Sequence, residues 1–132
     1  MVSCSKNRIK LTCVADGALL SSLHVTDICS IFGNALDNAI EYTAQVADPA
    51  ARLIHLIVAK RRNFIFIEVS NYIERKVEMK DGLPVSTKAD GRIHGYGVKS
   101  IRYTVRKYGG TVVFSQESPH EFAMRIMIPI RE

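Results

Sequence analysis

The sequence predicts an α+β fold, a two-layer α/β sandwich with helices on one face of a mixed, mostly antiparallel sheet. Two segments have the apolar spacing of helices, and two pairs of β-rich runs are each joined by a short polar turn. The order along the chain is strand, helix, hairpin, loop, helix, hairpin. The 132 residues, 47% of them hydrophobic, suffice for one core and not for two. We therefore expect residues 1–132 to form a single domain.

The longest periodic segment runs from Ile28 to Gln45. At roughly 100° per residue its apolar side chains share one broad arc, and its amide and carboxylate side chains form a narrow stripe on the other side. Thr26 is the expected N-cap, and the helix must end before Pro49, because proline cannot continue it. Cys29 falls on the apolar arc, where we expect a small core residue.

The other elements follow from alternation, glycines and turns. The expected strands are Arg8 to Val14, Arg52 to Lys60, Phe64 to Asn71, Thr111 to Ser115 and Phe122 to Ile130. A second helix, Val98 to Tyr108, is stopped by Gly109 and Gly110. Between them, Tyr72 to Ile93 is charged and shows no sustained period. Loops of this length in compact domains are commonly functional, so we expect a ligand lid over about residues 72–94.

Composition narrows the function classes. No run approaches the ~18 to 20 apolar residues of a membrane span, and the polar start lacks the apolar core of a signal peptide. Three Cys show neither the pairing of a secreted scaffold nor metal-ligand spacing, which favours cytosolic thiols. The net charge is +5, but the segment from Leu11 to Ala51 has no Lys or Arg, so the second half is the anion-seeking half. A basic balance fits nucleic acid, an acidic membrane surface or a small phosphorylated ligand, and we see no recognition pattern that favours nucleic acid.

The polar stripe of the first helix is a candidate metal site. Asn34 and Asn38 lie one turn apart, so their side chains project side by side, and each offers a carbonyl oxygen that Mg²⁺ accepts. Glu41 and Tyr42 extend the same edge by one turn. Taken alone, the stripe is equally compatible with the solvated face of an ordinary surface helix.

The second helix begins at a candidate anion site. Gly95 and Gly97 let backbone N–H groups approach a phosphate without Cβ interference, and the helix dipole adds roughly half a positive charge there. A lone Gly-x-Gly is more often a plain loop. Here Lys88 and His94 precede it and Lys99 follows, which strengthens the anion-binding interpretation.

Both sites resemble those of one family. The run Asn34-Ala35-Leu36-Asp37-Asn38-Ala39-Ile40-Glu41 resembles the N box of the GHKL family, which includes histidine kinases, type II topoisomerases, mismatch-repair ATPases and a large heat-shock chaperone. The segment from Ser86 to Ile101 is similar to the lid and G2 box of its histidine kinases, particularly those of bacterial peptide-sensing receptors. The resemblance spans roughly Thr26 to Pro129.

The resemblance implies the ligands and the residues that bind them. The cofactors would be ATP and Mg²⁺, with Asn38 as the metal ligand. The implied catalytic residues are Asn34, Asn38, Lys88 and His94. The implied nucleotide-binding residues are Asn34, Asn38, Glu41, Tyr42, Asn71, Ile73, Lys88, His94, Gly95, Tyr96, Gly97 and Val98.

The sequence departs from the family pattern at two positions. The family's Asp-x-Gly-x-Gly motif, whose Asp binds the adenine amino group, is replaced here by Asn71 with Tyr72 and Ile73 after it. Asn71 can accept the same bond without the charge of a carboxylate, or it can simply cap a turn at the strand end. Hydrolytic members carry a Glu where Asn34 stands, and an amide cannot activate water as a base.

These features imply a protein histidine kinase rather than an ATPase. The resemblance implies the catalytic ATP-binding domain of a two-component sensor kinase, which transfers the γ-phosphate of ATP to a His on a separate dimerisation domain and serves a response regulator. None of the four His lies on an amphipathic dimerisation helix beside an acid. We expect a cytoplasmic domain of a membrane-bound sensor, with no nucleic-acid partner and no membrane contact of its own. The alternatives are a degenerate nucleotide-binding module that acts by interaction, and a basic nucleic-acid binder.

The isolated chain is expected neither to label itself with γ-phosphate nor to hydrolyse ATP appreciably, because it lacks a placed acceptor His and a basic side chain at Asn34. Labelled ATP, followed by gel and by phosphate release, is the measurement. Adding the dimerisation domain should restore transfer. Rapid phosphate release by the chain alone would show that the reaction class is wrong.

Overall fold

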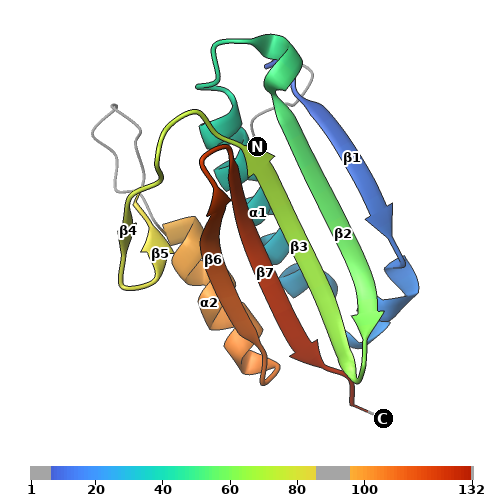
Figure 1. Ribbon diagram of the computed structural model, residues 1–132. Coiled ribbons are helices and arrows are strands. Elements are labelled where there is room, and N and C mark those ends of the chain that lie inside the picture. The colour runs from blue at the N-terminus through green and yellow to red at the C-terminus, as the bar shows by residue number, and fades with distance from the viewer. Residues whose placement is uncertain (1–6, 86–95, 132) are drawn as a thin grey trace.

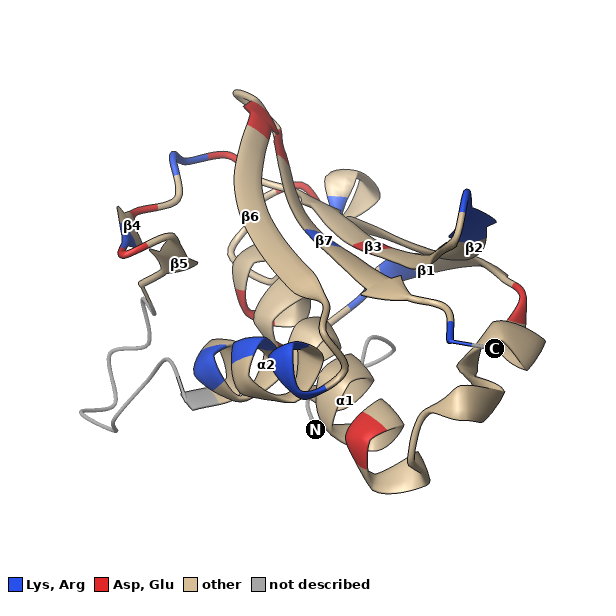
Figure 2. Ribbon diagram, turned by 90° about the horizontal axis from the view of Figure 1, so that it is seen from below, with Lys and Arg blue, Asp and Glu red and all other residues tan. Residues whose placement is uncertain are grey.

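The computed structural model describes residues 7–85 and 96–131 and has two layers (Figure 1). A five-stranded sheet forms one layer, in the order β1-β2-β3-β7-β6. The helices α1 and α2 pack side by side on one face of that sheet (Figures 1 and 2). The predicted α+β class and the arrangement of helices on one face are confirmed.

The sheet is mixed and mostly antiparallel. Its strands are β1 (Lys10–Ala15), β2 (Leu53–Arg61), β3 (Phe64–Tyr72), β6 (Thr111–Ser118) and β7 (Glu121–Pro129). The edge strand β1 runs parallel to β2, and the other neighbours are antiparallel. Both predicted hairpins form. The second is longer than expected, because β6 and β7 continue to a turn at Pro119 and His120.

The helices are α1 (Val25–Thr43) and α2 (Tyr96–Lys107), and short 3-10 turns cover Gly17–Ser22 and Pro49–Ala51. The helix α1 starts earlier than predicted, with His24 as its N-cap and Thr26 inside the first turn. The backbone N–H of His24 donates to the Tyr108 hydroxyl at 3.1 Å, so a tertiary contact fixes this helix start. Cys29 is exposed, contrary to expectation, because the buried arc of α1 is narrower than the apolar arc of the sequence.

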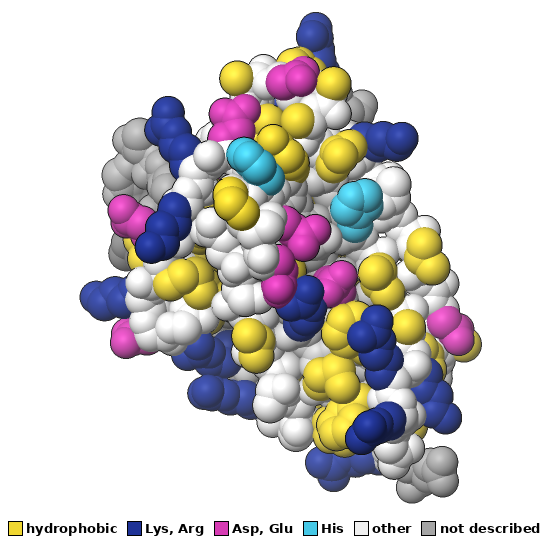
Figure 3. Space-filling view, in the orientation of Figure 1, with side chains coloured by type: hydrophobic (Ala, Val, Ile, Leu, Met, Phe, Trp, Pro, Cys, Tyr) yellow, Lys and Arg dark blue, Asp and Glu magenta, His cyan; other side chains and the backbone are white. Residues whose placement is uncertain are grey.

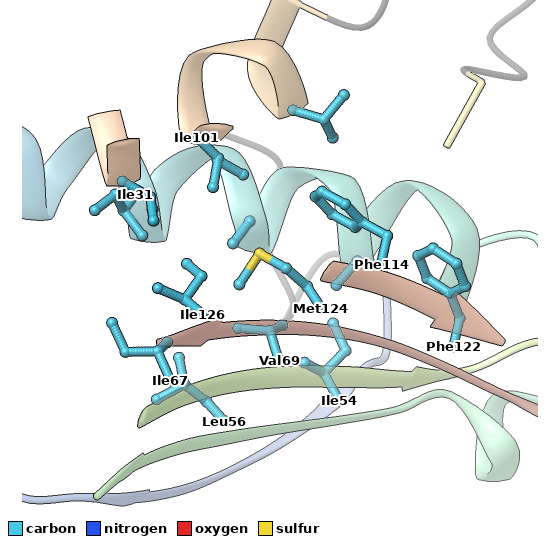
Figure 4. Packing of buried hydrophobic residues seen from close by; sticks show 14 of the residues in the cluster. Ile31, Ile54, Leu56, Ile67, Val69, Ile101, Phe114, Phe122, Met124 and Ile126 are labelled. Carbon is cyan, nitrogen blue, oxygen red and sulfur yellow. The ribbon is translucent and has the colours of Figure 1, made fainter. Parts of the chain in front are cut away.

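The core lies between the helices and the inner sheet face (Figure 4). Ile31 of α1 and Ile101 of α2 are fully buried and point toward sheet residues such as Ile67 and Ile126, which are also fully buried. Removing each such side chain from water stabilises the fold by roughly 1.5–3 kcal/mol. Since the inner strand positions alternate strictly with outer ones, this packing sets the register of the sheet.

The expected long loop is partly structured. A small hairpin of β4 (Met79–Lys80) and β5 (Leu83–Pro84) lies within it. Three apolar side chains of the expected loop, Ile73, Val77 and Leu83, are buried, with exposed fractions of 2%, 4% and 7%. The sequence therefore did not predict the short hairpin at residues 79–84 or these buried side chains, because they are too widely spaced to produce a period. Residues 86–94 of the expected lid lie outside the described residues.

Within residues 7–85 and 96–131, no helix covers the opposite sheet face (Figures 1 and 2), which carries both apolar and charged side chains (Figure 3). Val14 and Val113 are 74% and 57% exposed there. Arg125 donates to Glu68 at 2.6 Å and also pairs with Glu117. No helix among the described residues combines the length and apolar character that a membrane span needs.

Gly110 is expected to be intolerant of a side chain, because it lies where α2 turns into β6 against the end of β7. A Cβ there would lie 2.6 Å from the Met127 carbonyl oxygen and 2.9 Å from Ile128. Gly110→Ala should destabilise the fold by about 1–3 kcal/mol, as overpacking does. Urea unfolding is the measurement, and Gly17→Ala, which meets no atom within 4 Å, is the matched control. Equal stability of both variants would contradict the close packing.

Candidate functional site

The structure places the polar stripe of α1 against the first turns of α2. The Ser30 and Ser100 hydroxyls lie 3.3 Å apart across the two helices. Asn34 Nδ2 donates to Ser30 Oγ at 3.3 Å, which directs the amide oxygen toward α2. A Cβ added to Gly97 would lie 3.2 Å from that Asn34 Oδ1. The two sequence motifs thus meet at one place, although Asn34 and Gly97 are 63 residues apart in the chain, and the glycine permits the close approach.

The next turns of α1 carry further side-chain oxygen atoms. Asn38 and Glu41 are half-buried, one and two turns after Asn34 on the same helix. Asp37 Oδ1 on the same polar stripe is buried and has no hydrogen-bond partner among the described residues. A buried carboxylate oxygen without a partner is costly unless a water or a cation lies beside it. These oxygens fit a hydrated Mg²⁺, which keeps several waters and takes one or two protein ligands besides phosphate.

Tyr42 and Ile73 line one cavity of about 540 Å³ beyond the end of the stripe. The Tyr42 hydroxyl donates to the Val85 carbonyl oxygen at 2.8 Å and so ties α1 to the segment after β5. Burial, with the Glu41 and Glu78 carboxylates nearby, raises the pKa of Tyr42 to about 12. Tyr42 is therefore a neutral donor at physiological pH.

Asn71 lies on the inner face at the end of β3. It is 3% exposed and pairs in register with Ile54 and Phe122. The Tyr42 ring packs on Phe122 at 5.9 Å between centroids, so Asn71 lies at the same end of the core as Tyr42. Its Nδ2 donates to the neighbouring Tyr72 carbonyl at 3.2 Å, a local bond that leaves the amide oxygen for another donor.

The far ends of the two helices are also joined. Asp27 of α1 accepts from the Tyr108 hydroxyl and, at 3.1 Å, from Lys107 Nζ. Both partners hold the pKa of Asp27 below its usual value. Asp27, Ser30 and Tyr108 are positioning residues that the sequence predictions missed. The signal was present in part, because Asp27 and Ser30 share the stripe with Asn34.

Other predicted site residues fall at or beyond the described boundary. Lys88, His94 and Gly95 lie outside the described residues, and Tyr96 is the first residue of α2. The Val98 side chain is 4% exposed and belongs to the core, so only its backbone can reach a ligand.

The sequence profile of the family described as GHKL domain matches residues 23–129, which is most of the chain. The chain therefore belongs to the GHKL family. A search of curated proteins found no match.

Solved structures show what kind of GHKL fold this is. The chain is similar to the catalytic domain of histidine kinase ThkA in a nucleotide-free form, with a TM-score of 0.68 and 16% identity over 96% of this chain and 82% of that one. For a mycobacterial sensor histidine kinase, MprB, the TM-score is 0.62 at 14% identity, over 96% and 85% of the two chains. For histidine kinase AdeS of Acinetobacter baumannii the TM-score is 0.63 at 12% identity, over 98% of this chain and 58% of that one. The fold resembles that of histidine kinase catalytic domains.

Tyr42→Phe is expected to lower stability by about 0.5–1.5 kcal/mol at neutral pH, because it removes the bond to Val85. The folded pKa of Tyr42, about 12, lies above its ordinary 10.0, so its contribution is complete below pH 10 and is lost as the pH rises toward 12. Urea unfolding of both proteins from neutral to alkaline pH measures this.

The difference in stability between wild type and Tyr42→Phe should therefore shrink between about pH 10 and 12. Tyr103→Phe is the control, since Tyr103 is 71% exposed. A difference that stays constant with pH would contradict the burial argument for Tyr42.

Proposed function

We propose that this chain is the ATP-binding catalytic domain of a two-component sensor histidine kinase. It binds Mg-ATP and transfers the γ-phosphate to a His on a separate dimerisation domain, for relay to a response regulator. The parent protein is a membrane-bound sensor of the peptide-sensing receptor type, and this domain lies on its cytoplasmic side.

One observation carries the proposal, which is the contact between Gly97 and the Asn34 amide oxygen. A Cβ built at Gly97 would lie 3.2 Å from that oxygen. This contact brings the edge of α1 that carries Asn34 and Asn38 against the start of α2 at Gly97. Free N–H groups at a helix start bind phosphate oxygens, and amide oxygens bind the cation that accompanies them. This combination fits a nucleotide polyphosphate better than it fits an uncharged ligand.

Each residue has a distinct task in this proposal. Asn38 holds Mg²⁺, which when bound neutralises the phosphate charge that develops during transfer. The backbone N–H groups of Gly97 and Val98 donate to the phosphate oxygens at the start of α2, and the bond from Asn34 to Ser30 orients the Asn34 amide there. Lys88 and His94 add positive charge from the lid. Glu41 lies at the pocket edge.

The adenine end is formed by Asn71, Tyr42 and Ile73. Asn71 accepts from the adenine amino group, while Tyr42 and Ile73 contribute apolar surface beside it. Tyr42 also holds the segment after β5 through Val85, so the base and the lid share one anchor.

The His that accepts the γ-phosphate comes from another domain in this proposal. The His55 ring is hydrogen-bonded to Thr12 on the outer sheet face. His120 stacks on Tyr72 at 5.2 Å between centroids, and His24 caps α1. These three residues stand on the outer sheet face, at a turn and at a helix start, and Asn34 cannot serve as a base for water. Phosphoryl transfer to an external His is therefore the reaction that suits this site.

A degenerate module that binds partners without kinase activity is the second candidate. The specific observation is Asn71, a neutral and buried residue at the adenine position, followed by the buried Ile73 in place of a glycine. Loss of charge at this position weakens base recognition, and a bulky residue limits the backbone beside the base.

Asn38→Ala should weaken Mg-ATP binding much more than binding of ATP without Mg²⁺, because the lost amide is a metal ligand. Calorimetric titration with and without Mg²⁺ is the measurement. The control is Asn63→Ala, which changes an exposed Asn in the β2–β3 turn and should alter neither the affinity for Mg-ATP nor that for ATP alone. Equal losses in both titrations of Asn38→Ala would rule out the metal role.

Asn71→Asp should increase the affinity for ATP by up to about tenfold, because a charged hydrogen bond is worth ~1.5–3 kcal/mol against ~0.5–1.5 kcal/mol for a neutral one. It should also improve discrimination against GTP, since a carboxylate cannot donate to the guanine carbonyl as an amide can. Competition of ATP and GTP on both proteins is the measurement.

The fold of Asn71→Asp needs a separate check by urea unfolding, because the bond from Nδ2 to Tyr72 is lost. A folded variant with unchanged ATP affinity and unchanged ATP-to-GTP ratio would mean that Asn71 does not contact the base.

A further inference from the structure

The turn between β6 and β7 is bonded to the end of β3. In Figure 1 this turn lies beside the end of β3 from which the chain runs on toward β4. The regular pairing of β3 with β7 ends at Tyr72 and Glu121. One residue further, the Ile73 backbone N–H donates to the His120 carbonyl oxygen at 3.0 Å. His120 therefore extends the contact between the two strands beyond the regular ladder.

The His120 imidazole completes this extra pair. Its Nδ1 lies 3.1 Å from the Ile73 carbonyl oxygen. Because a carbonyl oxygen can only accept, Nδ1 carries the proton and donates it to this bond. In a regular antiparallel pair the backbone N–H of His120 would make this bond, but that N–H is directed to Ser118 Oγ at 3.2 Å. The imidazole thus replaces a backbone donor, and His120 holds both backbone polar groups of Ile73.

The His120 ring also stacks on the side chain before Ile73. The planes of the His120 and Tyr72 rings are 3° apart, with 5.2 Å between their centroids. His120 itself is exposed in the turn, outside the hydrophobic core. A change of this ring is therefore expected to leave the domain folded.

These bonds reach Asn71 through one peptide unit. The N–H of the Tyr72–Ile73 peptide donates to the His120 carbonyl oxygen, and the C=O of the same peptide accepts from Asn71 Nδ2 at 3.2 Å. A rotation of this peptide would break both bonds. The imidazole opposes such a rotation, because it fixes the carbonyl on the other side of Ile73. The orientation of the Asn71 amide thus depends on His120.

The orientation of the Asn71 amide decides which nucleobase it can bind. The Tyr72 carbonyl can only accept, so Nδ2 faces it and Oδ1 remains for another donor. An oxygen atom there accepts from the amino group of adenine, whereas guanine has a carbonyl in that place and needs a donor. Asn71 is 3% exposed, so an amide that faces the wrong base would leave a buried polar group unpaired.

We propose that His120 is a positioning residue that sets the preference of this site for ATP over GTP. It acts without touching the nucleotide, through the Tyr72–Ile73 peptide that holds the Asn71 amide with its oxygen toward the base. This role rests on the proposed function, in which Asn71 binds adenine. It adds the residue that keeps Asn71 from rotating to accept guanine.

Two variants separate the donor of His120 from its ring. His120→Phe keeps a ring that can stack on Tyr72 and removes the donor. His120→Asn removes the ring and keeps a donor, because the side-chain nitrogen of Asn, like Nδ1 of His, is attached to Cγ. The control is His55→Phe, the same change at a His of the outer sheet face that bonds to Thr12 rather than to Ile73. Urea unfolding checks that each variant is folded, and His120→Leu replaces His120→Phe if the latter is not.

The measurement is the ratio of the affinities for Mg-ATP and Mg-GTP, from calorimetric titration of the whole chain. His120→Phe should lower this ratio by about three- to tenfold, which is within the range for one neutral hydrogen bond. The ratios of wild type, His120→Asn and His55→Phe should agree within about twofold. A general loss of packing would weaken both nucleotides and leave the ratio unchanged.

A double-mutant cycle with Asn71→Asp tests whether His120 acts through Asn71. A carboxylate has only acceptor oxygens, so it presents the same groups to the base in either orientation. In the Asn71→Asp background, His120→Phe should therefore change the ATP-to-GTP ratio by less than about twofold.

Hydrogen exchange tests the positioning without nucleotide. The Ile73 N–H should exchange about three- to tenfold faster in His120→Phe than in wild type, because the pair with His120 opens more often. In His120→Asn the exchange should stay within about twofold of the wild-type rate.

Several results would overturn the proposal. These are equal affinities of the wild type for ATP and GTP, an unchanged ratio in folded His120→Phe, an equal loss in His120→Asn, or an equal effect of His120→Phe in the Asn71→Asp background. Unchanged exchange at Ile73 would also overturn it. A wild type that binds neither nucleotide would overturn the proposed function and the base preference together, and the exchange rates would then decide the positioning of Ile73 alone.

Discussion

The close approach of α2 to α1 is the constraint on which the rest of the site depends. At one end Gly97 lies against the Asn34 amide, and at the other Tyr108 and Lys107 bond to Asp27. Between them, the two serines meet at 3.3 Å. This seam contains polar groups that satisfy one another, whereas the buried side of each helix is mostly apolar. The helices therefore have one mutual orientation, and the start of α2 faces the amide edge of α1.

The sheet supplies the opposite boundary of the site. Burial of Ile54, Val69 and Phe122 in the inner row brings the end of β3 beneath α1, so that Asn71 lies at the same end of the core as Tyr42. The residues proposed to bind the nucleotide thus come from a helix, a strand end and a helix start that are distant in the sequence. Only the packed core brings them together, which explains why single-residue changes in the core can affect a site that they do not touch.

Most of the fold was predictable from periodicity, since the two helices and both hairpins show clear apolar spacing. Asn34 and Asn38 were predictable because helical geometry puts them on one edge. The β4–β5 hairpin was not, because its strands have two residues each and its anchors are isolated apolar side chains within a charged segment. The start of α1 at His24 depends on Tyr108, and no local signal reports a partner 84 residues away. The exposure of Cys29 likewise depends on where α2 and the sheet stop covering α1.

The parallel pairing of β1 with β2 bears on how the chain folds. The pairs β2–β3 and β6–β7 are joined by tight turns, whereas β1 reaches β2 only after the chain has passed through α1, and β3 reaches β7 only after it has passed through α2. Parallel pairing of this kind requires a long crossover and closes a large loop. With β2 as its only neighbour and few buried side chains, β1 is the strand with the least to hold it. It is therefore the strand expected to dock last during folding and to open first in the native state.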